Sequence, residues 1–153
     1  MRASKAISEP VDDLVLEQEV SLSAAEAYRR WTVEEELKKF FAPDLRIDLR
    51  PGGDFEVLFD MTQPEGLRGS EGCVIVGFVP ATEVSFTWNF PPSIPTLRDQ
   101  HTIVRVGFEA LGAQRTRVTL RQSGWKKEGA WPNGFEYFKR AWGFVLGNFA
   151  KGV

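Results

Sequence analysis

The clearest structural signal in this 153-residue sequence is its last stretch, residues 131–149. At 100° per residue its apolar side chains fall within about one third of the helical circle, which is typical of a helix that covers a core. These side chains are Phe135, Phe138, Trp142, Val145, Leu146 and Phe149. Pro132 suits the first turn, and Gly152 stands where a left-handed cap would end the helix. We therefore expect a long C-terminal helix against which the rest of the domain packs.

Upstream of this helix the hydrophobic pattern has a period of two, which predicts β-strands. We expect strands at residues 14–20, 45–49, 55–59, 68–79, 84–90, 99–110 and 116–124. Two short helices, residues 24–31 and 33–40, are expected after the first strand. Ser23 and Thr32 each begin an S/T-x-x-E capping box, in which the side chain caps the start of a helix.

Short connections such as Pro51-Gly52-Gly53 favour antiparallel pairing of the strands that they join. A curved antiparallel sheet wrapped around one long helix buries both apolar surfaces, so we predict an α+β fold of that form. The expected organisation is a single domain at residues 14–153 that follows a flexible arm at residues 1–13. We expect the sheet to close incompletely around the helix and to leave a pocket between them.

The composition excludes several function classes. There are 19 Lys and Arg against 21 Asp and Glu, so the net charge of −2 favours neither nucleic acid nor an anionic membrane. No apolar run approaches the ~18–20 residues that span a bilayer, and we expect no membrane insertion. The polar N-terminal residues predict no secretory signal, and a single Cys73 suits a reducing compartment. We therefore expect a cytoplasmic protein.

Five motifs, in order along the chain, resemble one superfamily. They are AAEAYRRWT at residues 24–32, KFFAP at 39–43, RPGGDF at 50–55, VSFTW at 84–88 and VTLRQSGW at 118–125. Together these motifs are similar to the START-like, helix-grip superfamily, also labelled SRPBCC. Within it the chain resembles the family named for the activator of heat-shock-protein-90 ATPase, and the resemblance covers roughly residues 14–149.

The resemblance implies a helix-grip fold with a cavity, because members of the superfamily bind lipids, hormones or polyketides. Some members cyclise or hydrate such molecules, and the protein that names the family stimulates a chaperone. We therefore expect this chain to bind a small hydrophobic or amphipathic molecule without a metal or covalent cofactor. A cyclase-like or hydratase-like enzyme is one alternative, and a chaperone ATPase-activating module is another.

The candidate ligand-binding residues are those whose phase points them into the expected cavity, in which aromatic walls with few polar anchors are typical. They are Trp31, Phe41, Phe55, Val57, Phe59, Trp88, Val104, Val106, Phe108, Gln122, Phe138 and Trp142. Large rings also pack densely, so a dry core without room for a ligand is the alternative. Gln122 either orients a ligand or satisfies backbone groups at the end of its strand.

Other polar residues predict no catalytic or metal centre. His101, the one histidine, is expected on the convex side of the sheet, and Cys73 is expected to be a buried thiol rather than a nucleophile. One His, one Cys and scattered carboxylates do not assemble a metal site at these spacings. The strand carboxylates Glu56, Asp60 and Glu71 are expected on a solvated convex face.

Two glycines interrupt the long helix. Gly143 and Gly147 lie one turn apart and off the apolar stripe, and each costs roughly 1 kcal/mol against alanine. They indicate either tight packing against the sheet or entry helices, or a partner surface with Phe144 exposed at a homodimer contact.

Overall fold

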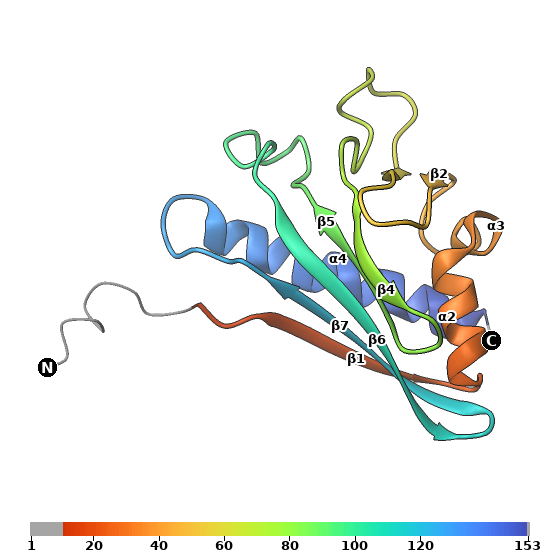
Figure 1. The fold of residues 1–153 in the computed structure, drawn as a ribbon. Helices are drawn as coiled ribbons and strands as arrows, with labels where there is room; N and C mark the ends of the chain where they lie inside the picture. Colours follow the sequence, from red (N-terminus) through yellow and green to blue (C-terminus); the bar gives the residue numbers. More distant parts are fainter. Residues whose placement is uncertain (1–10, 153) are drawn as a thin grey trace, which may run out of the picture.

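The computed structural model describes residues 11–152, so residues 1–10 of the predicted arm lie outside the described part of the chain. The elements in order are β1 (Leu14–Val20), α2 (Ala24–Thr32), α3 (Glu34–Leu37), β2 (Asp44–Ile47), β3 (Phe55–Leu58), β4 (Ile75–Val79), β5 (Glu83–Trp88), β6 (Thr102–Gly112), β7 (Arg115–Ser123) and α4 (Trp131–Lys151). Five strands form an antiparallel sheet in the order β1-β7-β6-β5-β4, and β2 pairs with β3 in a separate hairpin. Figure 1 shows the long, twisted strands of the sheet lying across α4. The predicted α+β architecture is confirmed.

The helix α4 carries the expected apolar face. Of the six side chains in the predicted stripe, five are buried, and Phe135 is half-buried near the start of the helix. Pro132 does occupy the first turn. The left-handed cap is wrong, because Gly152 has a φ of −83° and its N–H bonds back to the Phe149 carbonyl.

The two capping boxes have different outcomes. Ser23 caps α2 as predicted, and its Oγ accepts the Glu26 N–H at 3.1 Å. The Thr32 cap is wrong, because the Thr32 Oγ1 donates back to the Tyr28 carbonyl at 2.8 Å. Val33, which has no side-chain oxygen, therefore precedes α3 instead. The second helix is accordingly one turn long, shorter than the predicted residues 33–40.

The predicted strand at residues 68–79 is also wrong in its first half. Only Ile75–Val79 forms β4, while residues 68–74 fold back as a turn with single bridges to Leu58 and Asp54. The reason is a tertiary contact: the Gly69 backbone lies so close to Val57 that it belongs to the β2–β3 hairpin rather than to the sheet. The irregularity expected from the scattered glycines is present, since the β4 register shifts between Ile75 and Gly77.

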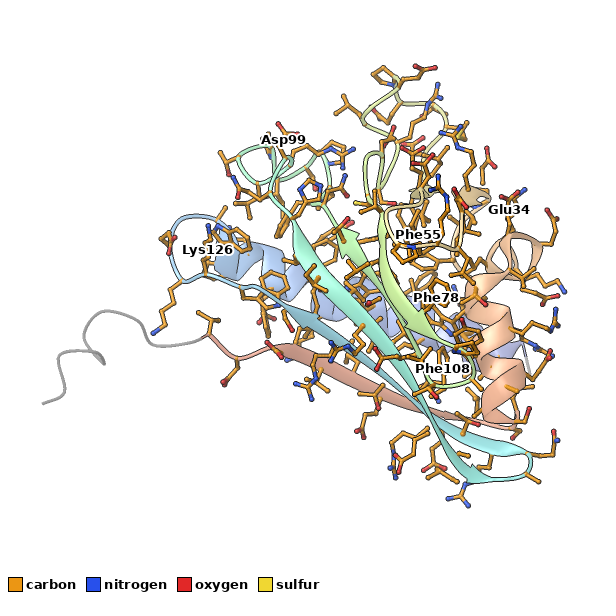
Figure 2. The ribbon with its side chains drawn as sticks, viewed as in Figure 1. Glu34, Phe55, Phe78, Asp99, Phe108 and Lys126 are labelled. Carbon is orange, nitrogen blue, oxygen red and sulfur yellow. The ribbon has the colours of Figure 1, made fainter. Side chains whose placement is uncertain are left out.

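The space between the sheet and the helices is filled mainly by aromatic and branched side chains. Phe55, Phe86 and Trp31 are each 1% exposed, and the rings of Phe55 and Phe86 lie 4.3 Å apart. Figure 2 shows Phe55 and Phe108 within this packed region, whereas Asp99 and Lys126 extend outward from loops. The interior beneath the sheet is therefore dense, and any room for a ligand lies at its margin.

Candidate ligand-binding groove

Two adjoining cavities lie along one side of α4, with volumes of about 550 and 290 Å³. Four aromatic residues line both cavities: Phe59, Trp88, Tyr137 and Phe138. The larger one is also lined by Phe41, Arg140, Ala141, Trp142, Phe144 and Val145. The smaller one continues toward the loops with Asp60, Gln63, Leu67, Arg68, Gly69, Asn89, Phe90, Pro91, Pro92, Ser93 and Arg98. We call the two cavities together the α4 groove.

The walls of the α4 groove are held by ring-to-ring contacts between distant parts of the chain. The Trp88 ring at the end of β5 lies 5.0 Å from Trp142 on α4 and 5.8 Å from Phe41 after α3. Phe59, just after β3, completes the wall at 6.3 Å from Trp88. Such tilted and edge-on pairs are each worth about 0.5–1.5 kcal/mol beyond their area burial. The groove is therefore formed on a rigid aromatic floor.

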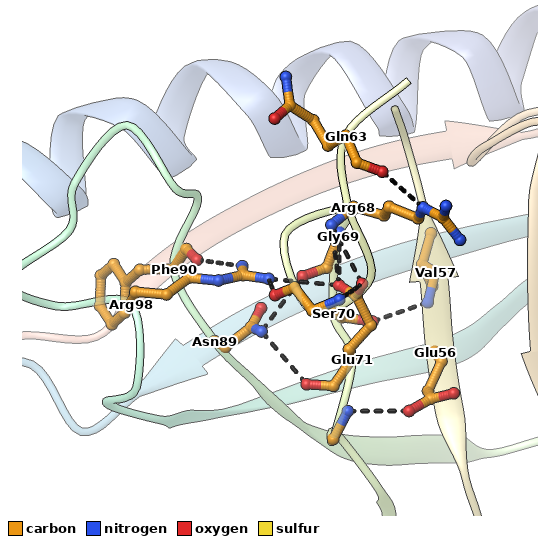
Figure 3. Close-up of polar contacts among 12 residues, drawn as sticks. Glu56, Val57, Gln63, Arg68, Gly69, Ser70, Glu71, Asn89, Phe90 and Arg98 are labelled. Atoms are coloured by element: carbon orange, nitrogen blue, oxygen red, sulfur yellow. Dashed lines mark hydrogen bonds and ion pairs between the residues drawn. The ribbon is translucent and has the colours of Figure 1, made fainter. Parts of the chain in front are cut away.

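The end of the groove near the loops is fixed by the polar contacts of Glu71 and Arg98, which we call the Glu71 clasp and which Figure 3 shows. The Glu71 carboxylate accepts the backbone N–H groups of Gly66, Arg68 and Gly69 at 2.7–3.1 Å. Because these N–H groups belong to the loop between β3 and β4, one side chain closes the loop on itself. That loop supplies one wall of the smaller cavity.

Arg98 connects this loop to the segment after β5. Its guanidinium donates to the Phe90 and Gly66 carbonyls and lies 3.2 Å from the Glu71 Oε1. Only 11% of the Arg98 side chain is exposed, so this ion pair is screened far less than the pairs on the open surface. Asn89 adds a donor to the Gly69 carbonyl at 3.2 Å. The two loop walls of the smaller cavity are thus tied together.

We expect Glu71→Gln to lower the free energy of unfolding by about 1–3 kcal/mol at pH 7, because the amide cannot accept all of these N–H groups. Burial raises the Glu71 pKa, but the N–H groups of Arg68, Gly69 and Gly66 more than offset this and hold it below the usual 4.5. A lowered carboxyl pKa contributes stability above pH 4.5 that is lost as the pH falls through the folded pKa.

Urea unfolding of wild type and Glu71→Gln at a series of pH values checks this prediction. The difference in the free energy of unfolding between wild type and Glu71→Gln should be largest near neutral pH and should become smaller as the pH falls below 4.5. Glu83→Gln is the matched control, because Glu83 pairs with Arg105 on the open surface at 3.5 Å and such pairs contribute little. An equal loss of stability in Glu71→Gln and Glu83→Gln would contradict the claim that the Glu71 carboxylate holds the loop between β3 and β4.

Residues 21–153 match the model of the family described as Activator of Hsp90 ATPase homolog 1-like protein. The chain belongs to this family. The resemblance that the five sequence motifs indicated is thereby confirmed. No curated protein matches the chain.

Solved structures share the fold of this family member. NE0264 from Nitrosomonas europaea is 24% identical with a TM-score of 0.69, and the match covers 94% of this chain and 96% of that one. The Aha1 dimer from Colwellia psychrerythraea is 14% identical with a TM-score of 0.60, covering 92% and 94%. DynU16, from the dynemicin biosynthetic locus, is 17% identical with a TM-score of 0.66; the match covers 93% of this chain and 47% of that chain. At these identities the likeness shows the fold alone.

The structure separates the sequence-predicted site residues into two groups. Five of them line the α4 groove: Phe41, Phe59, Trp88, Phe138 and Trp142. The other seven line neither cavity and lie in the packed core at no more than 6% exposure: Trp31, Phe55, Val57, Val104, Val106, Phe108 and Gln122. The inward phase of a side chain therefore does not distinguish a wall of the groove from the packed core.

Gln122 takes neither of the roles considered from the sequence. Its side chain is fully buried, its Oε1 accepts the Trp142 indole N–H at 2.8 Å, and its Nε2 donates to the Thr102 Oγ1 at 2.9 Å. Both ends of the amide are thus occupied by side chains. Gln122 fixes the ring of Trp142, which in turn forms part of the groove wall.

Tyr137, Glu71 and Arg98 are among the contributors to the groove that sequence reasoning missed. Tyr137 is outside the apolar stripe that the sequence indicates, but it lines both cavities, because the groove reaches around the flank of the helix. Glu71 was expected on a solvated face but closes the loop instead. Arg98 gave no signal, because only the folded chain brings it together with its partners, two backbone carbonyls and the Glu71 carboxylate.

The two other candidates, His101 and Cys73, lie outside the α4 groove. His101 is exposed and lines neither cavity, and burial raises the pKa of the Cys73 thiol to about 11, so it is a poor nucleophile near neutral pH. Among the described residues no group of three His, Cys, Asp or Glu is placed to hold a metal ion. No helix of residues 11–152 is long and apolar enough to cross a membrane.

Proposed function

We propose that the chain binds a small apolar or amphipathic molecule in the α4 groove. The observation that carries this proposal is that three of the exposed large apolar side chains gather at this groove. Phe59, Leu67 and Phe144 are 45%, 38% and 71% exposed, and all three border the groove. Apolar surface gathered around a hollow favours a binding site, whereas single exposed residues need no explanation.

The polar groups of the groove suit recognition better than proton transfer. Burial raises the pKa of Tyr137, so its hydroxyl stays protonated at neutral pH and can donate a hydrogen bond. Hydrogen bonds from Thr62 lower the pKa of Asp60, so this carboxyl stays ionised. Both pKa values are shifted away from 7, near which a general acid or base works best. The groove therefore favours a binding role over a cyclase-like or hydratase-like activity.

A bromo-alkyl alcohol tests the proposal, because bromine quenches tryptophan fluorescence only on close contact. Trp88 and Trp142 line the groove, whereas Trp31 and Trp125 line neither of its cavities. We expect saturable quenching with one site per chain, and most of it should disappear in Trp88→Phe.

Phe59→Ala should weaken binding of the same probe about tenfold, since it removes a wall shared by both cavities. Val79→Ala is the matched control, because Val79 is 51% exposed and lines neither cavity. Quenching that is non-saturable, or that Val79→Ala reduces as much as Phe59→Ala does, would count against the groove.

Membership of the family favours one second candidate, stimulation of a chaperone ATPase. The test is the ATPase rate of the cognate chaperone with and without this protein. Equal rates at saturating protein would eliminate this function without affecting the ligand-binding proposal. A cytoplasmic location, which such a partner requires, stays a prediction.

A further inference from the structure

The outer face of α4 carries no packing partner within residues 11–152. The glycines that were candidates for tight packing face open space, since a Cβ at Gly143 or Gly147 would meet nothing within 4 Å. Between them Phe144 is 71% exposed, which is the highest value among the large apolar side chains of the described chain. Packing against the sheet therefore does not explain these residues.

The charges on this face have a specific arrangement. Glu136, Arg140 and Lys151 are all exposed, and none of the three forms an ion pair within the described chain. At 100° per residue they share about one third of the helical circle with Gly143, Phe144 and Gly147. Fifteen residues of helix separate Glu136 from Lys151, or about 22 Å, so the two cannot reach each other in one chain.

We propose that this face is the interface of a two-fold homodimer in which the α4 helices of two copies pack antiparallel. We place the crossing point of the two helices between Gly143 and Phe144. In an antiparallel pair, a residue that precedes this point in one helix then faces the residue that follows it by the same distance in the other helix. Glu136 then faces Lys151 of the second copy, and the reciprocal pair forms at the other end. Each Phe144 lies over Gly143 of the other helix, where the missing side chain makes room for the ring.

The second copy also completes the α4 groove. Tyr137, Arg140 and Phe144 belong to this face of the helix and line the larger cavity, so the opposing helix covers its open side. This part of the inference rests on the proposed ligand-binding function, whereas the dimer itself does not. We expect the bromo-alkyl alcohol to dissociate more slowly from the dimer than from the monomer.

Charge exchange on the full chain tests the interface by sedimentation velocity over a range of protein concentrations. Glu136→Lys or Lys151→Glu alone should raise the dimer dissociation constant about tenfold, because each places like charges at both ends of the contact. The double exchange should restore the wild-type value, since every opposite-charge pair is re-formed between copies. Phe144→Ala should raise the constant about a hundredfold.

Lys139→Glu is the matched control, because this exposed residue lies outside the shared third of the helical circle and should leave the dimer intact. Circular dichroism confirms that each variant is folded. A protein that is monomeric up to its solubility limit, or a dimer that the single exchanges leave unchanged, overturns the interface. Probe binding by such a monomer would leave the ligand-binding proposal standing, and a dimer that binds no probe would refute only that proposal.

Discussion

Replacing Gly69 by alanine is expected to lower the free energy of unfolding by about 3 kcal/mol or more. A Cβ at this position would lie 1.8 Å from the Val57 carbonyl oxygen and 2.9 Å from its carbon, and backbone atoms cannot give way as a flexible side chain does. The shift must break the bonds by which Ser70 holds β3, namely its N–H to the Val57 carbonyl and the Val57 N–H to its Oγ. Chemical denaturation measures the loss.

The same substitution should also open the smaller cavity, because Gly69 is part of its wall. Gly107→Ala is the control, since a Cβ there meets only the Thr119 and Thr82 carbonyls at 4.0 Å. We expect that variant to stay within about 0.5 kcal/mol of wild type. Equal stability of the Gly69 and Gly107 variants would mean that residues 68–70 do not pair with β3 as described.

A second large effect is expected from Gln122→Leu, which should cost about 2–3 kcal/mol. Leucine has a similar volume but leaves the Trp142 indole N–H, now 2.8 Å from the Gln122 Oε1, buried without an acceptor. Trp31 already carries such a donor, the one buried side-chain polar atom among the described residues that lacks a partner. A second buried donor without an acceptor should therefore lower the midpoint temperature of thermal unfolding.

A double-mutant cycle separates this lost bond from changes in packing. Trp142→Phe removes the indole N–H, so adding Gln122→Leu to it should cost less than Gln122→Leu costs alone. Thr102 loses its partner amide in both backgrounds, and its Oγ1 keeps the Trp88 carbonyl at 3.3 Å. Strictly additive losses would show that the Gln122–Trp142 bond contributes nothing to stability.

Much of the fold was predictable because the signals for its helices and strands lie in short stretches of sequence. β1 has the bounds that alternation predicts, and α4 begins at Trp131, the first residue of the stretch that was expected to be helical. Ser23 was found from its capping box, which acts within one turn of helix. Such signals depend on near neighbours in the chain, and they hold when no tertiary contact competes with them.

The groove was predictable only in part, because its shape depends on contacts between distant segments. Strand phase places Trp88 and Val104 alike on the inner face, but Trp88 lines the groove and Val104 lies in the packed core, a difference that no periodicity records. The same reason explains why the position of Glu71 was predicted wrongly. Strand alternation indicated that its side chain faces solvent, but the loop between β3 and β4 folds so that backbone N–H groups of Gly66 and Gly69 donate to its carboxylate. The phase of Phe59 was right, yet 45% of it is exposed because β3 ends one residue before it.

The most direct test of the central claim, that apolar ligands enter the α4 groove, is an amide and indole NMR titration with an unlabelled alkyl alcohol. We expect shift changes to be confined to the groove, with Phe59, Trp88, Tyr137 and Phe144 moving together and saturating at one molecule per chain. Ile103, which is 40% exposed and lines neither cavity, should not move. Shifts centred on Ile103 and its neighbours, or no saturable shift at Trp88, would contradict the account.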